Sequence, residues 1–229
     1  MRHPSGIIRT IRWAVVMIFV AFIAARPGWC APTVLIDPGH GGDDRGVRIS
    51  DNLYEKDVTV AIARMIQRNL LESGRIAVQL TRNDDRELTT AQRTTVAVRL
   101  RPQLLVGLHV NAGFGRKSCG YEMFFPGFGT TRAPGAARSV RKDGTKTAYL
   151  NESVRFAQIA GRHLERVFPR KGRGLRDADI PLLEGTTLPA VVVEIGFATH
   201  PDDKKSIADP ATQKAIAQAL SVAISDYFR

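Results

Sequence analysis

The chain has 229 residues, of which 44% are apolar, so it is long enough for a single domain with a buried core. It is strongly basic, with 33 lysines and arginines against 22 acidic residues, and a basic surface suits an anionic polymer. Nucleic acid is disfavoured as a partner, because the chain has no nucleic-acid-binding motif and only 7% aromatic residues to stack on bases. Of its two cysteines, Cys30 lies at the boundary of the predicted N-terminal export segment, which leaves Cys119 alone, so we expect no structural disulfide.

The first thirty residues predict an export segment. Three arginines and no acidic residue precede an apolar run of 13 residues, Trp13–Ala25. This is the pattern of a secretory signal, and the run is short for a membrane span. We expect residues 1–30 to be a signal peptide or an uncleaved N-terminal anchor, which would be the only contact with the membrane. Residues 31–229 would form the catalytic domain, which works in the periplasm or cell envelope, and a mature form would begin near Ala31.

Three apolar runs end at or near polar residues: Val34–Ile36 before His40, Leu104–Leu108 before His109 and Asn111, and Ala190–Val193 before Glu194. Uninterrupted apolar runs are typical of strands buried on both faces. We therefore predict an α/β fold, a single domain with a mostly parallel, twisted sheet and helices on both faces. Because the carboxyl ends of parallel strands meet at one edge of a sheet, His40, His109 and Glu194 should lie close together.

Two imidazoles and carboxylates at one sheet edge form a donor set that suits zinc. An ionised carboxylate within an apolar run such as that of Glu194 is costly unless a cation compensates it. Each residue taken singly also has a simpler interpretation. His40 can be a loop histidine bonded to nearby backbone, and Glu55, next to Lys56, can be a first-turn carboxylate favoured by the helix dipole.

The remaining pattern alternates helices and strands. It predicts helices over Lys56–Glu72, Thr89–Leu100, Asn151–Phe168 and the segment after Asp209-Pro210, and strands over Ile76–Thr81 and Gly120–Phe125. We expect Arg93 and Arg99 to lie on a solvated helix face and Glu122 to mark a strand near a sheet edge. His163 is expected to be a surface or packing histidine, and His200 a loop residue.

Four short motifs stand in order along the chain: Asp37-Pro-Gly-His-Gly-Gly42, Tyr54-Glu-Lys-Asp57, Leu108-His-Val-Asn-Ala112 and Val193-Glu-Ile-Gly-Phe197. Together they resemble the motif set of the zinc-dependent N-acetylmuramoyl-L-alanine amidases, the amidase_3 family of peptidoglycan hydrolases. The resemblance runs from about Thr33 to the C-terminus and implies a zinc-exopeptidase-like fold. It implies that His40, Glu55 and His109 bind one Zn²⁺ and that Glu194 is the catalytic carboxylate.

The resemblance also points to substrate contacts. Gly172–Asp179 and Pro181–Leu183 are similar to the family stretch that approaches the substrate cleft before the last strand. Within it Arg176 is a candidate for holding a substrate carboxylate, and a plain loop salt bridge is the alternative. Asn111, which closely follows His109, is a second candidate.

The implied reaction is hydrolysis of the amide bond between N-acetylmuramic acid and L-alanine in peptidoglycan. This would release stem peptides from the glycan during wall remodelling or daughter-cell separation. The alternatives are a zinc exopeptidase acting on free peptides and a non-catalytic wall-binding module, although neither a ligand nor the base is missing. We expect a monomer whose partners are peptidoglycan and, by the resemblance, an activator protein of the cell envelope.

The segment Pro126–Leu150 is rich in glycine, proline, threonine and basic residues, which predicts a long basic loop. Some amidases of the family carry a self-inhibitory helix in this interval, but the composition here disfavours a stable helix. A basic loop beside a zinc cleft would attract the carboxylates of stem peptides. A solvated loop without a role is the alternative.

Overall fold

The computed structural model describes residues 31–126, 144–169, 171–178, 182 and 188–229. Its centre is a six-stranded sheet in the order β4 (Ala77–Leu80), β1 (Thr33–Pro38), β5 (Leu104–Asn111), β8 (Ala190–Phe197), β6 (Tyr121–Pro126), β7 (Gly172–Ala178). The first four strands in this order are parallel, whereas β6 runs antiparallel to β8 and β7 runs parallel to β6. The predicted α/β fold with a mostly parallel sheet is confirmed.

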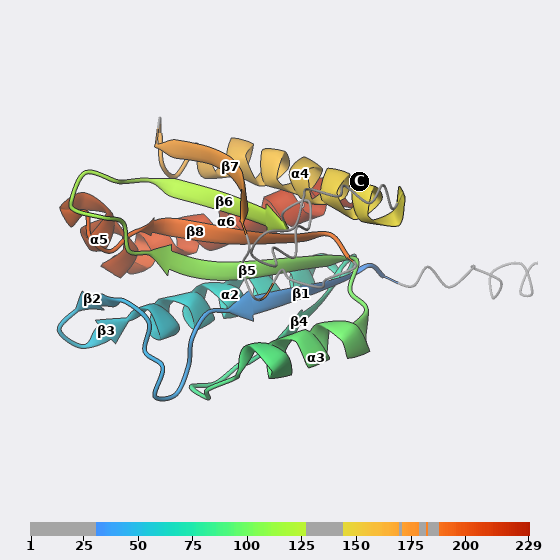
Figure 1. Cartoon of the computed structure of the whole chain (residues 1–229), viewed down its shortest axis with the longest axis horizontal. Coiled ribbons are helices and arrows are strands. Elements are labelled where there is room, and N and C mark those ends of the chain that lie inside the picture. Colours follow the sequence, from blue (N-terminus) through green and yellow to red (C-terminus); the bar gives the residue numbers. More distant parts are fainter. Residues whose placement is uncertain (1–30, 127–143, 170, 179–181, 183–187) are drawn as a thin grey trace, which may run out of the picture. The chain divides into compact units, whose positions relative to one another are not determined.

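Helices lie on both faces of the sheet (Figure 1). One face packs against α2 (Glu55–Ser73), α4 (Gly144–Leu164) and α6 (Pro210–Tyr227), and these helices share the larger apolar cluster. The other face packs against α3 (Thr90–Leu100), whose Ala97 belongs to a smaller cluster. The hairpin of β2 (Arg48–Ser50) and β3 (Leu53–Tyr54) precedes α2, and the short helix α5 (Pro201–Ala208) follows β8. No helix within the described ranges is long and apolar enough to cross a membrane.

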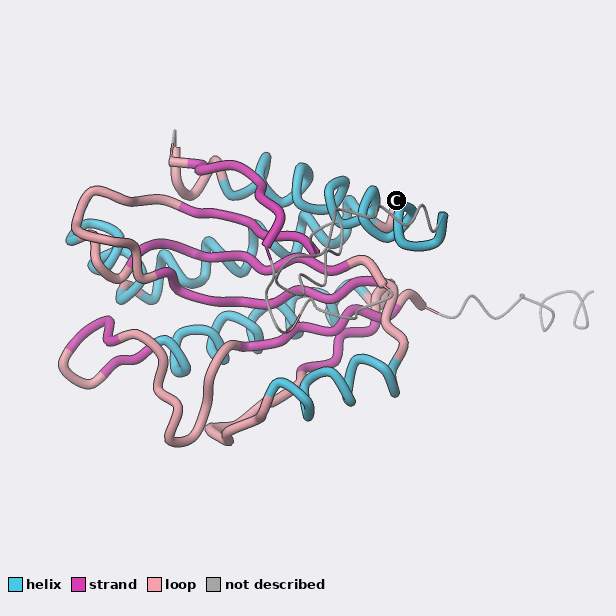
Figure 2. Tube along the Cα trace, in the orientation of Figure 1, coloured by secondary structure: helices cyan, strands magenta, loops and turns pink. Residues whose placement is uncertain are grey.

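The alternation of side chains along each strand decides where the polar residues lie. Val34 and Ile36 enter the larger cluster, while Leu35 between them enters the smaller one on the α3 face. In the same way Leu105 on β5 and Val192 on β8 belong to the α3 face. Because alternate residues share a face, His109 and Glu194 also face the α3 side, at the carboxyl ends of their strands. The loops that follow β1, β5 and β8 gather at this same edge (Figure 2).

Several predicted boundaries need correction. Helix α4 begins at Gly144, so 144–150 are helical and not part of a loop, and it ends at Leu164, before the predicted Phe168. The rest of the predicted basic loop, 127–143, lies outside the described residues. Strand β6 is second from the edge, which agrees with the expected position near an edge, and the edge strand is β7, which the sequence did not predict as a strand. Helix α2 ends at Gly74, which has a left-handed backbone with φ 63°, a conformation that glycine adopts without strain.

Three smaller predictions concern two histidines and a cysteine. His163 packs between helices, with its Nε2 2.8 Å from Asp226 Oδ2, which agrees with a packing role. His200 is the N-cap of α5. Cys119 is a free cysteine within the described part of the chain.

Arg93 does not lie on a solvated face, so that prediction is wrong. The residue is 7% exposed and its Nη1 lies 2.7 Å from Oδ1 of the buried Asp37. Its guanidinium also donates to the carbonyl oxygens of Pro38 and His40, both at 2.8 Å. Arg99, on the same helix, is exposed as predicted. The helical pattern did not distinguish the two arginines, because the difference between them is a contact with a distant segment. Only Arg93 pairs with a buried carboxylate, that of Asp37 on β1.

Replacing Arg93 by alanine should lower the free energy of unfolding by about 3–5 kcal/mol, because Asp37 would remain buried without its cation. Chemical denaturation of the full chain measures this loss. Arg99→Ala removes the same charge from the exposed side of the helix and should change the stability by no more than about 0.5 kcal/mol. Equal effects of the two substitutions would contradict the structural role of the Asp37–Arg93 pair.

Candidate metal centre

His40 is placed by an abrupt turn at the end of β1. Pro38 and Gly39 stop the strand, and His40 has a φ of 60°, a left-handed backbone that is uncommon for a residue other than glycine. Gly41 and Gly42 continue with positive φ angles. Both carboxylate oxygens of Asp44 lie 2.8 Å from His40 Nδ1. The other ring nitrogen, Nε2, is thereby left to face Glu55 Oε2 at 3.1 Å.

Glu55 is the first residue of α2 and is 2% exposed. Its carboxylate accepts hydrogen bonds from two backbone amides, Val47 N at 3.1 Å on Oε2 and Val110 N at 2.9 Å on Oε1. The Val110 bond ties the start of α2 directly to β5. Glu55 is therefore more than a solvated first-turn carboxylate, because it is held between the His40 turn and the strand that carries His109.

His109 completes the cluster from β5, with its Nδ1 3.0 Å from Glu55 Oε1. Each of His40, Glu55 and His109 offers one ligand atom, and these atoms all lie within 4.8 Å of one another. Two glycines make the close approach possible. A Cβ on Gly39 would lie 2.5 Å from the His109 ring, and one on Gly46 would lie 2.6 Å from Glu55 Oε2. The structure thus brings the three predicted ligands together.

The charges in this cluster fit a divalent cation. The hydrogen bond to Glu55 is the main reason that the pKa of His40 rises to about 9, and Asp44 adds to it. Burial by itself would raise the pKa of Glu55, but the hydrogen bonds from His109 and His40 outweigh it and lower that pKa to about 2. The carboxylate is therefore ionised at neutral pH. Two imidazoles and one ionised carboxylate are a zinc donor set that leaves a fourth position open, and a bound ion would replace the protons on the imidazoles.

Glu194 lies beside His109 in the register of β8 with β5. Its Oε2 is shielded from solvent and has no hydrogen-bond partner among the described residues. Burial raises the pKa of Glu194 to about 7, with the nearby His109 opposing the shift and Glu55 and Glu122 adding to it. A carboxyl group with such a pKa can accept a proton near neutral pH and release it again.

Asn111 and Arg176 both contact Glu122. Asn111 Nδ2 donates to Glu122 Oε2 at 3.3 Å, and Arg176 Nε lies 3.0 Å from Glu122 Oε1. Arg176 is on strand β7 and forms a salt bridge, which was the alternative considered from the sequence. Glu122 is 4% exposed and stands opposite Glu194 in the antiparallel register of β6 with β8. From the sequence, Glu122 indicated only that its strand lies near an edge of the sheet. An acidic residue within an apolar strand can also indicate a polar site on one face of the sheet, and that interpretation would have found Glu122.

A buried arginine that sequence reasoning missed holds the His40 turn in place. Arg82 is fully buried, and it donates to the carbonyl oxygens of Pro38 at 3.2 Å, Gly39 at 2.8 Å and Lys56 at 2.9 Å. Lys56 adds a hydrogen bond from its Nζ to the Gly42 carbonyl oxygen at 2.8 Å. The available signal was the position of Arg82 just after the strand that pairs with β1. Together these cations fix the backbone from which His40 projects.

Comparison with known proteins agrees with this geometry. The family model for N-acetylmuramoyl-L-alanine amidases (Amidase_3) matches residues 34–226. YqiI of Bacillus subtilis is 29% identical over 197 residues, covering 86% of this chain and 84% of YqiI. N-acetylmuramoyl-L-alanine amidase AmiC of Escherichia coli O6:H1 is 24% identical, and the match covers 85% of this chain but only 52% of AmiC.

Solved structures show the same fold. The CwlD amidase of Clostridioides difficile, solved in complex with the GerS lipoprotein, is 27% identical and superposes with a TM-score of 0.71. That match covers 86% of this chain and 98% of CwlD. The fold, the order of the four motifs and the family match over most of the sequence agree with one another. The chain therefore belongs to the Amidase_3 family and is an N-acetylmuramoyl-L-alanine amidase, as its motifs predicted.

Proposed function

We propose that this protein uses one zinc ion, held by His40, Glu55 and His109, to hydrolyse the amide bond between N-acetylmuramic acid and L-alanine of peptidoglycan. The observation that carries the proposal is Glu194, a buried carboxyl group with an unpartnered oxygen, beside a cluster of three donors whose atoms lie within 4.8 Å. A general base next to a three-ligand site is the arrangement of a catalytic zinc centre rather than a structural one.

Zinc bound by these ligands would lower the pKa of a water molecule to near 7 and polarise the scissile carbonyl. Glu194 takes a proton from the attacking water and passes it to the nitrogen of the leaving L-alanine. The water oxygen bonds to the carbonyl carbon, the carbon–nitrogen bond breaks, and the products are the lactyl carboxylate and the free amine. Asp44 holds the His40 ring in orientation through Nδ1, so that Nε2 remains directed into the cluster.

Two substrate contacts are proposed around Glu122. Asn111 and Arg176 both lie against its carboxylate, so the Arg176 guanidinium is anchored near the base rather than free in solution. An anchored guanidinium still has donors left for a substrate carboxylate, and its position is set before binding. The pair would orient the stem peptide beside the scissile bond.

Mass spectrometry of digested peptidoglycan tests the reaction. Release of stem peptides with a free L-alanine amine, and of glycan with intact lactyl groups, is the expected result. A zinc exopeptidase would instead shorten free peptides that carry no muramoyl group, and a wall-binding module would release nothing. Either of these results would overturn the proposed function.

We also propose that the protein is exported, with residues 1–30 as its signal or anchor and a mature chain that begins within a few residues of Ala31. The basic and then apolar N-terminus supports this proposal. N-terminal sequencing of the protein from its native envelope is the measurement. A chain in the membrane fraction that still begins at Met1 would identify an anchor, and one in the cytoplasm would contradict export.

Control by an envelope protein is a further part of the proposal. The structure of CwlD was solved in complex with the GerS lipoprotein, so an amidase of this fold can form a complex with a lipoprotein. We propose that this chain is a monomer that acts on peptidoglycan and associates with an activator of the cell envelope. Measuring hydrolysis by the purified full chain with and without envelope extract tests this, and equal rates would argue against an activator.

A further inference from the structure

A cavity of ≈ 490 Å³ lies at the end of β8, apart from the cluster of His40, Glu55 and His109. It is bordered by Ser50 of β2, Arg116 of the β5–β6 loop, Thr199 of the turn after β8, and Lys204 of α5. Small-molecule sites commonly measure about 300–1,000 Å³, so the cavity has room for part of a substrate. The amidase reaction described above does not use it.

The cavity is lined by positive and not by negative side chains. Arg116, Lys204 and Lys205 border it, and no described residue that lines it is acidic. Neither Arg116 nor Lys204 takes part in an ion pair within the described part of the chain. Asp203, next to Lys204, is turned into the protein, where its Oδ2 accepts from Gly120 N at 2.6 Å and Phe197 N at 3.1 Å. The nearest carboxylate in sequence therefore does not neutralise Lys204.

A hydroxyl group at the wall of the cavity also lacks a partner. The Oγ1 atom of Thr199 is shielded from solvent and makes no hydrogen bond to any described residue. Because solvent does not reach this oxygen, the Thr199 side chain forms part of the wall of the cavity and is not itself a donor to a bound anion. Ser50 lines the opposite side of the cavity, with its hydroxyl directed away from the Lys204 ammonium.

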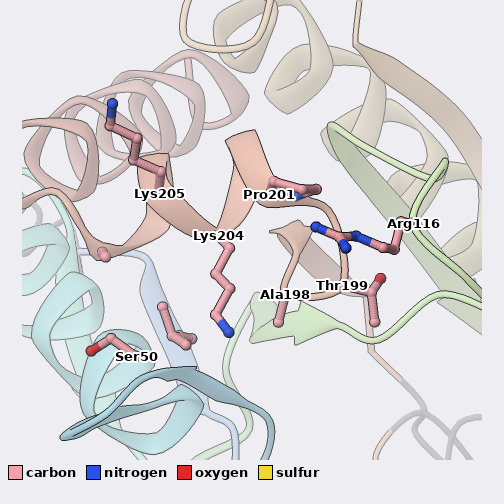
Figure 3. A pocket seen from close by; sticks show the side chains of 9 residues that line it. Ser50, Arg116, Ala198, Thr199, Pro201, Lys204 and Lys205 are labelled. Carbon is pink, nitrogen blue, oxygen red and sulfur yellow. The ribbon is translucent and has the colours of Figure 1, made fainter.

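Figure 3 shows which cation is directed inward. The Lys204 ammonium extends toward the space between Ser50 and Ala198, and Arg116 lies on the same side as Thr199. Lys205 begins on the next residue of α5 but points away from this space. Two cations from different elements, Lys204 and Arg116, thus border one cavity, and a carboxylate is the kind of ligand group that accepts hydrogen bonds from such charged donors.

We propose that this cavity binds a carboxylate of the stem peptide at a distance from the scissile bond. The proposal rests on the proposed amidase function, because the stem peptide is the carboxylate-bearing part of that substrate. Thr199 follows the strand that carries Glu194, and Ser50 belongs to the hairpin that leads into Glu55. A substrate that spans both places would be held at a second point while its amide bond lies at the zinc site.

Lys204→Gln tests this in the full-chain protein. The substrate pair is a muramoyl peptide with free stem-peptide carboxylates and the same compound with those carboxylates amidated. With the free carboxylates, Lys204→Gln should raise KM about 3- to 10-fold and leave kcat unchanged, as expected for loss of one partly exposed charged contact. With the amidated substrate it should have no effect, and Lys204→Arg should retain the wild-type KM.

Lys205→Gln is the matched control, since it removes the same charge from the adjacent residue, and it should behave as the wild type on both substrates. Equal KM changes for Lys204→Gln and Lys205→Gln would show that the effect comes from the net charge of the protein and not from a contact in the cavity. That result would overturn the proposal. So would a loss for Lys204→Gln that is as large on the amidated substrate. If the wild type cleaved the muramoyl amide normally but Lys204→Gln were indistinguishable from it, the cavity proposal alone would fail. Failure of the wild type on both substrates would instead overturn the amidase function.

Discussion

Glu194→Gln should reduce kcat by about 10²–10⁴-fold while the protein still binds about one zinc ion per chain. Glutamine has nearly the same shape as glutamate but does not accept a proton at neutral pH. Because Glu194 lies beside His109 without belonging to the group of three donor atoms, its loss should remove the base and keep the ligands. Single-turnover hydrolysis together with zinc content measures the two effects separately.

The pH dependence provides a second readout for Glu194. Burial raises its pKa to about 7, and a carboxyl group with a raised pKa is protonated, and so inactive as a base, below that pH. A bound zinc ion would lower this pKa, because a nearby cation favours the ionised form. We therefore expect kcat/KM to fall as the pH decreases, with a midpoint below about 7. A Glu194→Gln protein that lost zinc together with its activity would show that Glu194 is a ligand rather than the base.

His40→Ala and His109→Ala should each lose the metal ion and, with it, essentially all activity. Each imidazole supplies one of only three protein donors, and the open fourth position belongs to water and substrate. Treatment of the wild type with a chelator should give the same loss, and added zinc should restore the wild type but neither variant. Metal content per chain, measured by elemental analysis, reports binding without relying on the reaction.

His163→Ala is the control for these two variants. His163 is also a histidine paired with a carboxylate, but its partner is Asp226 on α6, and it lies on α4 rather than at the ends of the parallel strands. This variant should keep its zinc content. If it lost the metal as His40→Ala does, loss of zinc would reflect general unfolding. A His40→Ala protein with full zinc content would show that the ligand set is wrongly assigned.

The sequence determined the central part of the fold and the three donors. Uninterrupted apolar runs such as Val34–Ile36 are stable only where both faces of a strand are covered, so a parallel sheet between helices followed from them. The position of His109 and Glu194 at the ends of such runs then placed them at one edge. Glu55 was different, because its spacing alone favoured an ordinary helix-start carboxylate, and only its motif pointed to zinc.

Tertiary structure decided which charged residues are buried and what they contact. Arg93 and Arg99 look alike in a helical pattern. Only Arg93 is buried, because it pairs with Asp37 of β1, and it also donates to the His40 carbonyl oxygen and so supports the His40 turn. The same holds for Glu122, whose partners Asn111 and Arg176 come from two other strands. Contacts between distant segments leave no periodicity in a single sequence, so no local pattern reports them.

The start of α4 and the unpaired cations of the cavity are two further features that the sequence alone did not predict. Gly144 is a poor helix residue, yet α4 begins there, because extending an existing helix costs less than starting one. Lys204 and Lys205 are equivalent in the sequence, and only the way α5 is seated beside β2 and β8 directs one inward. The sequence by itself thus determined the sheet and the motif order, and its motifs pointed to the three donors that cluster in the structure. The tertiary structure decided the supporting ion pairs and the second cavity, because burial and pairing of charges depend on neighbours that are far away in the chain.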